Sequence, residues 1–219
     1  MIQNILRSDD FKLKNCINYI GVAAVTVVFS VLYFTGELKT SYANLLVQIG
    51  YSIILAVSLN LVVGFLGELS LGHAGFMCVG AYLGTFISIQ LNGVIESKVI
   101  CLLISMLIGG VVAAVFGFLV GLPALRLKGD YLAIVTLAFG EIVRTVFKNL
   151  PWFGKAMGLS TSAVKFSKKD FPLFIIVFIT VLVVLFLVQN LVRSKHGRAI
   201  TAIRDNEIAA KAMGINVTF

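Results

Sequence analysis

The chain has 219 residues, of which 59% are hydrophobic and 13% are charged. A soluble globular domain carries about 25% charged residues, so this composition excludes an ordinary soluble enzyme and predicts an integral membrane protein. The net charge of +8 does not indicate a nucleic-acid partner, because the Lys and Arg residues flank apolar runs, where loop orientation and anionic lipid explain them. The three cysteines lack metal-ligand and disulfide spacing, and we expect neither a metal nor a cofactor.

Six apolar stretches follow one another along the chain. A hydrocarbon core of about 30 Å needs about 20 residues of helix, and each stretch approaches or exceeds that length. They cover Ile17–Thr35, Ala43–Phe65, Leu71–Leu91, Val99–Leu122, Leu132–Phe147 and Leu173–Val192. We therefore predict an all-α, polytopic transmembrane helical bundle of about six spans. Residues 1–16 would form a tail, residues 17–192 the membrane domain and residues 193–219 a polar segment.

Six crossings return the C-terminus to the side on which the N-terminus starts. A cytoplasmic N-terminus places the larger share of Lys and Arg in the cytoplasm, as the positive-inside rule requires. The cluster Lys165–Lys169 opposes this orientation but does not reverse it. We expect a multi-pass protein in which residues 1–16 and 193–219 are both cytoplasmic.

Small residues recur every fourth position in the fourth stretch, at Gly109, Ala113, Gly117 and Gly121. A smooth strip of this kind allows another helix to approach closely, and close packing drives helix association in lipid. The strip predicts a multi-helix assembly and does not by itself indicate a transport site.

The segment Gly64–Gly75 interrupts two apolar stretches with glycines and with Glu68, Ser70 and His73. Lipid does not accommodate these polar groups unless protein or water faces them. Two interpretations stay open: a tight cytoplasmic turn between two spans, or a segment that lines the pathway or acts as a hinge. For the second, the candidate residues are Ser70, Gly72, His73 and Gly75.

Two charges stand inside the fifth stretch, Glu141 and Arg144. At a spacing of i, i+3 they face each other on a helix, and mutual neutralisation lowers the cost of placing them in a span. We interpret this pair as structural.

The polar segment Gly197–Asn216 is predicted to form one short helix with two different faces. Arg204, Glu207 and Lys211 would share one side, and a small-residue face would collect on the other, made of Ala199, Ala202, Ile203, Ala210 and Met213. Gly214 stands where a terminating glycine is expected. From the residues alone, a helix resting on the lipid bilayer and a helix that docks on a partner are both possible.

Three long blocks resemble one family, the LivM-type permease subunits of bacterial branched-chain amino acid ABC transporters. They are GELSLGHAGFMCVGAYLGTF at Gly67–Phe86, GLPALRLKGDYLAIVTLAFGEIVRTVF at Gly121–Phe147, and GRAITAIRDNEIAAKAMGIN at Gly197–Asn216. The resemblance implies a permease in the bacterial cell membrane, with no enzymatic role of its own. It also implies two cytoplasmic ABC ATPase subunits, a LivH-type second permease and an external substrate-binding protein. The sequence has no Walker A pattern, so nucleotide hydrolysis would belong to the partners.

Through this resemblance, the last block corresponds to a cytoplasmic loop of the family that is similar to the ATPase-contacting loop of ABC permeases. The implied ATPase-coupling residues are Arg198, Arg204, Asp205, Glu207, Ala209, Ala210 and Gly214. The alternative is a channel or assembly subunit of a membrane complex without an ATPase partner.

Two features depart from the family. The external loop has Trp152–Leu159 in place of a glycine-rich TGG-type turn, and the sequence stops at Phe219, where family members continue with further transmembrane helices. We therefore expect a C-terminally truncated chain.

Overall fold

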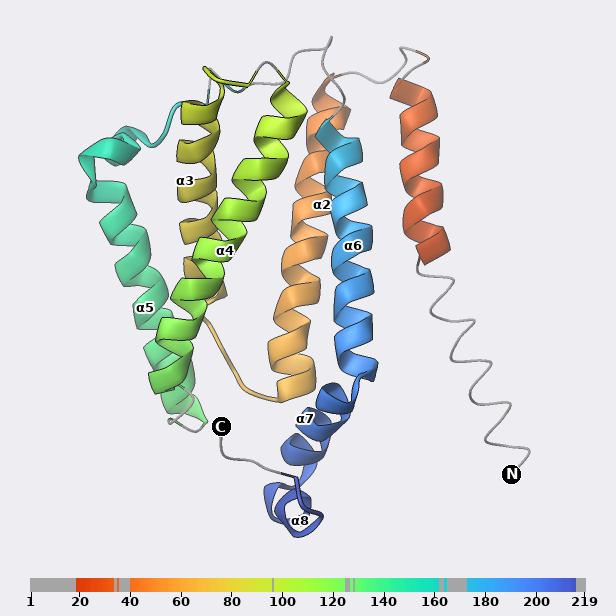
Figure 1. The fold of residues 1–219 in the computed structure, drawn as a ribbon, viewed down its shortest axis with the longest axis vertical. Coiled ribbons are helices and arrows are strands. Elements are labelled where there is room, and N and C mark those ends of the chain that lie inside the picture. Colours follow the sequence, from red (N-terminus) through yellow and green to blue (C-terminus); the bar gives the residue numbers. More distant parts are fainter. Residues whose placement is uncertain are drawn as a thin grey trace. The chain divides into compact units, whose positions relative to one another are not determined.

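The computed structural model describes residues 19–33, 35, 40–95, 97–124, 127, 129–161, 164 and 173–215. Every regular element in those ranges is helical (Figure 1), which confirms the predicted all-α class. The expected tail over residues 1–16 and the basic cluster at Lys165–Lys169 lie outside them. After a helix over Tyr19–Tyr33 come α2 (Thr40–Asn60), the π-helix η1 (Leu61–Leu66), α3 (His73–Leu91), α4 (Lys98–Ala124), α5 (Asp130–Asn149), the short 3₁₀ turns η2 (Pro151–Phe153) and η3 (Lys155–Met157), α6 (Leu173–Arg193), α7 (Lys195–Asp205) and α8 (Glu207–Ala212).

Four helices in the described part of the chain are long and apolar enough to cross a membrane: Ser41–Leu66, His73–Leu91, Lys98–Pro123 and Leu173–Arg193. They coincide with four of the six expected stretches. The first stretch contains the shorter apolar helix Tyr19–Tyr33. The fifth corresponds to α5, which is long enough but carries Asp130, Glu141, Arg144 and Lys148.

The chain divides into two compact units, Met1–Leu61 with Pro172–Phe219 and Val62–Phe171. In the first unit, Leu46 of α2 packs on Phe174 and Phe178 of α6. The helix Tyr19–Tyr33 runs antiparallel to α6. At one end, the rings of Tyr33 and Phe174 pack with their centroids 5.6 Å apart. At the other end, the Tyr19 hydroxyl donates to Gln189 Oε1 at 2.8 Å.

The second unit contains α3, α4 and α5, and glycines bring α3 and α4 together. A Cβ on Gly109 would lie 2.9 Å from the carbonyl oxygen of Gly80 and 3.2 Å from the Cα of Gly84. The expected small-residue strip is therefore used in part within the chain itself, because Gly109 packs on α3. Gly121, at the other end of the strip, has no neighbour within 4 Å of a Cβ placed on it.

Helices α3 and α5 lie side by side and run in the same direction. Val79, Val143, Phe147 and Phe153 form their buried cluster, and Tyr82 stacks against Phe147 with ring centroids 5.4 Å apart. This α3–α5 seam positions the segment that precedes α3.

Candidate functional site

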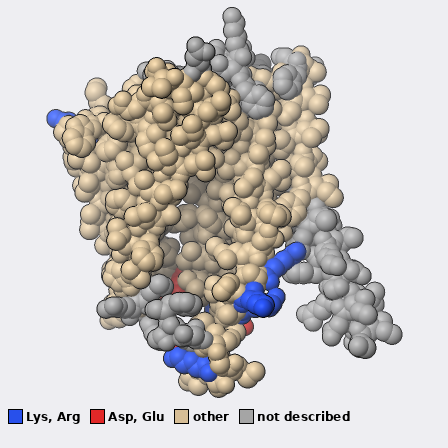
Figure 2. All heavy atoms as spheres, in the orientation of Figure 1, with Lys and Arg blue, Asp and Glu red and all other residues tan. Residues whose placement is uncertain are grey.

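Helices α7 and α8 form the polar end of the first unit, directly after α6 (Figure 1). Figure 2 shows that basic side chains gather over this end, while the visible surface of α6 above it is uncharged. The exposed Lys and Arg residues here are Arg193, Lys195, Arg198, Arg204 and Lys211. All seven residues expected to couple the chain to ATPases lie on these two helices or at their ends.

The turn from α6 into α7 is tight and capped. Ser194 is the N-cap of α7; its Oγ accepts from the N–H of Gly197 at 3.1 Å and donates to the carbonyl oxygen of Leu191 at 2.6 Å. A methyl group at Gly197 would overlap the carbonyl oxygens of Leu191 and Val192. Only a glycine fits this close approach, so α7 starts at a fixed angle to α6.

The prediction of one continuous helix over Gly197–Asn216 is wrong, because the helix breaks at Asn206. This residue is extended (φ −161°, ψ 104°) and ends α7 by donating its N–H to the carbonyl oxygen of Ala202 at 3.1 Å. Its side-chain Oδ1 begins α8 by accepting from the N–H groups of Ile208 and Ala209, each at 3.0 Å. An Asn side chain competes well with the helical backbone for such donors, so two capped helices replace one.

The end of α8 follows the sequence prediction. Gly214 has a positive φ of 80°, its N–H donates to the carbonyl oxygen of Lys211 at 3.0 Å, and the N–H of Ile215 donates to that of Ala210 at 3.1 Å. These two bonds define a Schellman motif. Gly214 therefore terminates α8 as expected.

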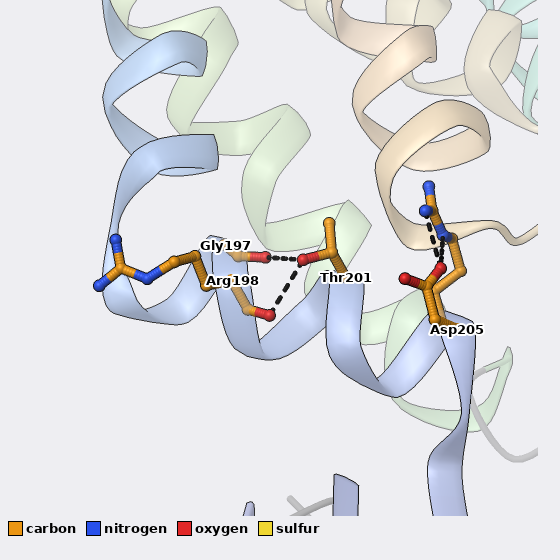
Figure 3. Close-up of polar contacts among 5 residues, drawn as sticks. Gly197, Arg198, Thr201 and Asp205 are labelled. Carbon is orange, nitrogen blue, oxygen red and sulfur yellow. Dashed lines mark hydrogen bonds and ion pairs between the residues drawn. The ribbon is translucent and has the colours of Figure 1, made fainter. Parts of the chain in front are cut away.

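Four of the charged residues form ion pairs within their own helix. Arg204 binds Asp205 through Nε at 3.0 Å and Nη2 at 2.8 Å, and Lys211 Nζ donates to Glu207 Oε1 at 2.9 Å. Figure 3 shows the Asp205 pair at one end of α7 and Arg198 at the other. Arg198 donates to the carbonyl oxygen of Arg193 at 2.9 Å. Because of the break, Arg204 lies on a different helix from Glu207 and Lys211.

Two exposed apolar side chains stand out on this polar pair. Ile208 is 81% exposed and Met213 is 82% exposed, whereas Ala210 is buried, at 4% exposed. The helical pattern predicted that Met213 and Ala210 share one face. In the structure Met213 is exposed and Ala210 is buried, so this part of the prediction is wrong. Ile208 was not among the expected coupling residues, although a large apolar residue in a polar run was a visible signal. We refer to these two exposed side chains, five positions apart, as the Ile208/Met213 knob.

The second set of expected residues lies where the chain enters α3. Ser70 and His73 are half-buried. Gly72 and Gly75 are buried against α5: a Cβ on Gly72 would lie 2.6 Å from the carbonyl oxygen of Thr136, and one on Gly75 would lie 2.7 Å from the Cα of Gly140. These two glycines allow close packing, and neither has a positive φ; the positive φ in this segment, 77°, belongs to Gly67.

Thr136 holds this segment in place and was not predicted from the sequence. Its Oγ1 accepts from the N–H of Leu71 at 3.1 Å and donates to the carbonyl oxygen of Ala133 at 3.0 Å. Leu71 lies in the non-helical segment before α3, so this hydroxyl satisfies a backbone group that apolar side chains could not satisfy. The signal available was a Thr among apolar residues in the first half of this helix, and such a residue is too common to be specific.

Comparisons with known proteins give one consistent result. A family model described as "Branched-chain amino acid transport system / permease component" matches residues 41–219. The LivM proteins of the high-affinity branched-chain amino acid transport systems of Salmonella typhimurium and Escherichia coli are 37% and 36% identical over 76% and 75% of this chain, and over 44% of their own length. A probable LivM protein of Methanocaldococcus jannaschii is 30% identical over 79% of this chain and 59% of its own. This chain thus spans roughly half the length of these relatives. No solved structure matches.

Proposed function

Because the chain belongs to the LivM-type family of branched-chain amino acid transport permeases, we propose that it is a permease subunit of an ABC importer. It moves branched-chain or related apolar amino acids into the cytoplasm. Two cytoplasmic ABC ATPases hydrolyse ATP, a LivH-type permease completes the membrane part, and an external binding protein delivers the substrate. The family match over residues 41–219 is the observation that carries this proposal.

In this proposal, helices α7 and α8 dock on an ATPase from the cytoplasmic side. Three observations support it: the pair follows a candidate span directly, its surface is basic, and it presents the Ile208/Met213 knob. Since Arg204, Asp205, Glu207 and Lys211 already form ion pairs within the helices, the knob supplies most of the docking energy. The charges shape and orient the surface.

Coupling then follows as a two-state equilibrium that the ATPases bias. Closure of the ATPases displaces the docked helices, and the tight turn at Ser194–Gly197 passes this displacement to α6 without a flexible linker. In the other unit, Gly72 and Gly75 pack closely on α5 at the entry into α3, and Ser70 and His73 are their neighbours in the chain. These residues are the candidates for the pathway or the gate.

The rival function is a channel or assembly subunit that has no ATPase partner. It requires the same membrane helices but gives α7 and α8 no protein to bind. Association with ATPases therefore discriminates between the two functions.

Co-purification of the chain with its candidate ATPases, together with leucine uptake into vesicles, tests the proposal. Met213→Asp places a charge in the knob, and we expect a loss of about 10- to 100-fold in ATPase affinity, since burying such a side chain contributes about 1.5–3 kcal/mol. The matched control is Met157→Asp, because Met157 is 99% exposed in η3 of the other unit. If the ATPases bind both variants like the parent protein, the docking role is wrong. If no ATPase binds the parent chain, the rival function is favoured.

A further inference from the structure

The register of α5 against α3 determines how deep each residue of α5 lies. Gly75 meets Gly140 at backbone distance, and one level further along, Tyr82 stacks on Phe147. From the first contact to the second, each helix advances by seven residues, so the two helices are parallel and keep the same register over this length. Glu141 and Arg144 lie between these two contact levels.

The charged pair therefore lies within the depth that α3 crosses. Helix α3 is itself a candidate span, beginning at His73. Gly75 and Tyr82 are about 3 Å and about 14 Å along its axis from that residue, at ~1.5 Å rise per residue. Glu141 and Arg144 lie between these levels, about 4.5 Å and about 9 Å from the start of α3, which is roughly one to two turns inside the candidate span.

Glu141 faces away from the seam, whereas Arg144 lies at its edge, one turn after Gly140 and within electrostatic range of Cys78 of α3. Helix α5 packs through its buried residues, which are Leu132, Ala133, Thr136, Val143 and Phe147. Glu141 and Arg144 form the expected ion pair, yet their side chains remain 61% and 62% exposed. Ionisable groups at membrane depth face a protein interior or a water-filled cavity, because acyl chains do not solvate them. This face of α5 must therefore meet something polar.

We infer that the Glu141–Arg144 pair is a binding site for the main-chain charges of an apolar amino acid on its way through the transporter. Arg144 binds the carboxylate, Glu141 binds the ammonium group, and the apolar side chain lies along Ile134 and Leu137. This inference rests on the proposed function, which supplies the substrate class.

Charge complementarity favours this occupant. A zwitterionic amino acid carries one positive and one negative group a few ångströms apart, which matches an i, i+3 pair that presents one of each. Ile134 and Leu137 lie seven and four positions before Glu141, on the same side of the helix, and they are 61% and 53% exposed. A lipid chain or an apolar helix would match Ile134 and Leu137 but would offer no polar group to Glu141 and Arg144.

Thiol labelling in the assembled transporter, reconstituted in vesicles, tests the site. Thr145 is exposed and lies one turn from Glu141 on the same side. Thr145→Cys should react with an anionic methanethiosulfonate about tenfold faster, or more, than the control Val111→Cys, because hydrocarbon excludes a charged reagent. Val111 is 64% exposed in the middle of α4, with no charged residue on that part of the helix. Labelling of the parent protein measures the background reaction of the native cysteines Cys16, Cys78 and Cys101. Ala138→Cys, one turn on the other side of Glu141, replaces Thr145→Cys if that variant does not assemble.

Protection identifies the ligand. Leucine at about twice its dissociation constant should slow labelling about threefold, whereas leucinamide, which lacks the carboxylate, and isocaproate, which lacks the ammonium group, should give no protection at the same concentration. Arg144→Gln should remove the protection by leucine. Labelling no faster than at Val111, with or without crosslinking to a second permease subunit, would overturn the inference, as would equal protection by all three compounds. A parent complex that takes up no leucine would contradict the proposed function instead.

Discussion

The α7–α8 pair and the α3–α5 seam are both held by glycine and by small polar side chains, yet the contacts span very different distances in the sequence. In the α7–α8 pair, the side chains of Ser194 and Asn206 accept from backbone N–H groups only two or three residues further along the chain. At the seam, Gly75 meets Gly140 and Thr136 accepts from the N–H of Leu71, across 65 residues. Local caps set the geometry of the proposed docking surface, whereas long-range packing sets the depth of the candidate pathway. A substitution in one region should therefore leave the other intact.

The seam should give the largest effect. Gly75→Ala places a methyl group 2.7 Å from the Cα of Gly140, and because that neighbour is backbone, the helices must separate. We expect a loss of about 1–3 kcal/mol or more, the usual cost of overpacking, measured as a lower midpoint of thermal unfolding in detergent.

Gly110→Ala is the matched control for this substitution, because Gly110 lies within helix α4 and a methyl group placed on it would have nothing within 4 Å. It should be neutral or slightly stabilising, since alanine favours helix over glycine by roughly 0.5–1 kcal/mol. Equal midpoints for the two variants would show that the seam is loose, and would remove the argument for the depth of Glu141 and Arg144. Binding of the ATPases by Gly75→Ala tests the independence of the two regions.

The same difference in range explains what the sequence alone could predict. Apolar stretches are local signals, and four of them appear as helices long enough to span a membrane. The end of α8 at Gly214 is also encoded locally and was predicted. The break at Asn206 is local too. It was not predicted, because the helical spacing of Ala202, Ile203 and Ala210 favoured one continuous helix over a break at a single Asn. The role of Thr136 and the register of α5 depend on residues far apart in the chain, and no pattern in one sequence connects them.

Substitution of Asn206, the residue that separates α7 from α8, should give an intermediate effect. Asn206→Ala removes the acceptor for the N–H groups of Ile208 and Ala209, and losing an N-cap costs about 1 kcal/mol. We expect faster hydrogen exchange at these two amides and weaker ATPase binding, with little change in the unfolding midpoint of the membrane helices. Asn206→Asp keeps an acceptor oxygen and should behave like the parent protein. If Asn206→Ala binds ATPases normally, the orientation of α8 does not matter for docking.

The ion pair on α8 should give the smallest effect. Lys211→Gln removes its bond to Glu207, and an exposed pair of this kind contributes about 0.3–0.5 kcal/mol and weakens as salt screens it. ATPase affinity measured at low and high salt should therefore fall about twofold or less in this variant, and the small difference should vanish at high salt. Met213→Asp, by contrast, should stay weak at both salt concentrations, because it disrupts an apolar contact. A large, salt-dependent loss in Lys211→Gln would mean that Lys211 leaves Glu207 to bind an acidic group on the ATPase, and that charge and not the Ile208/Met213 knob dominates docking.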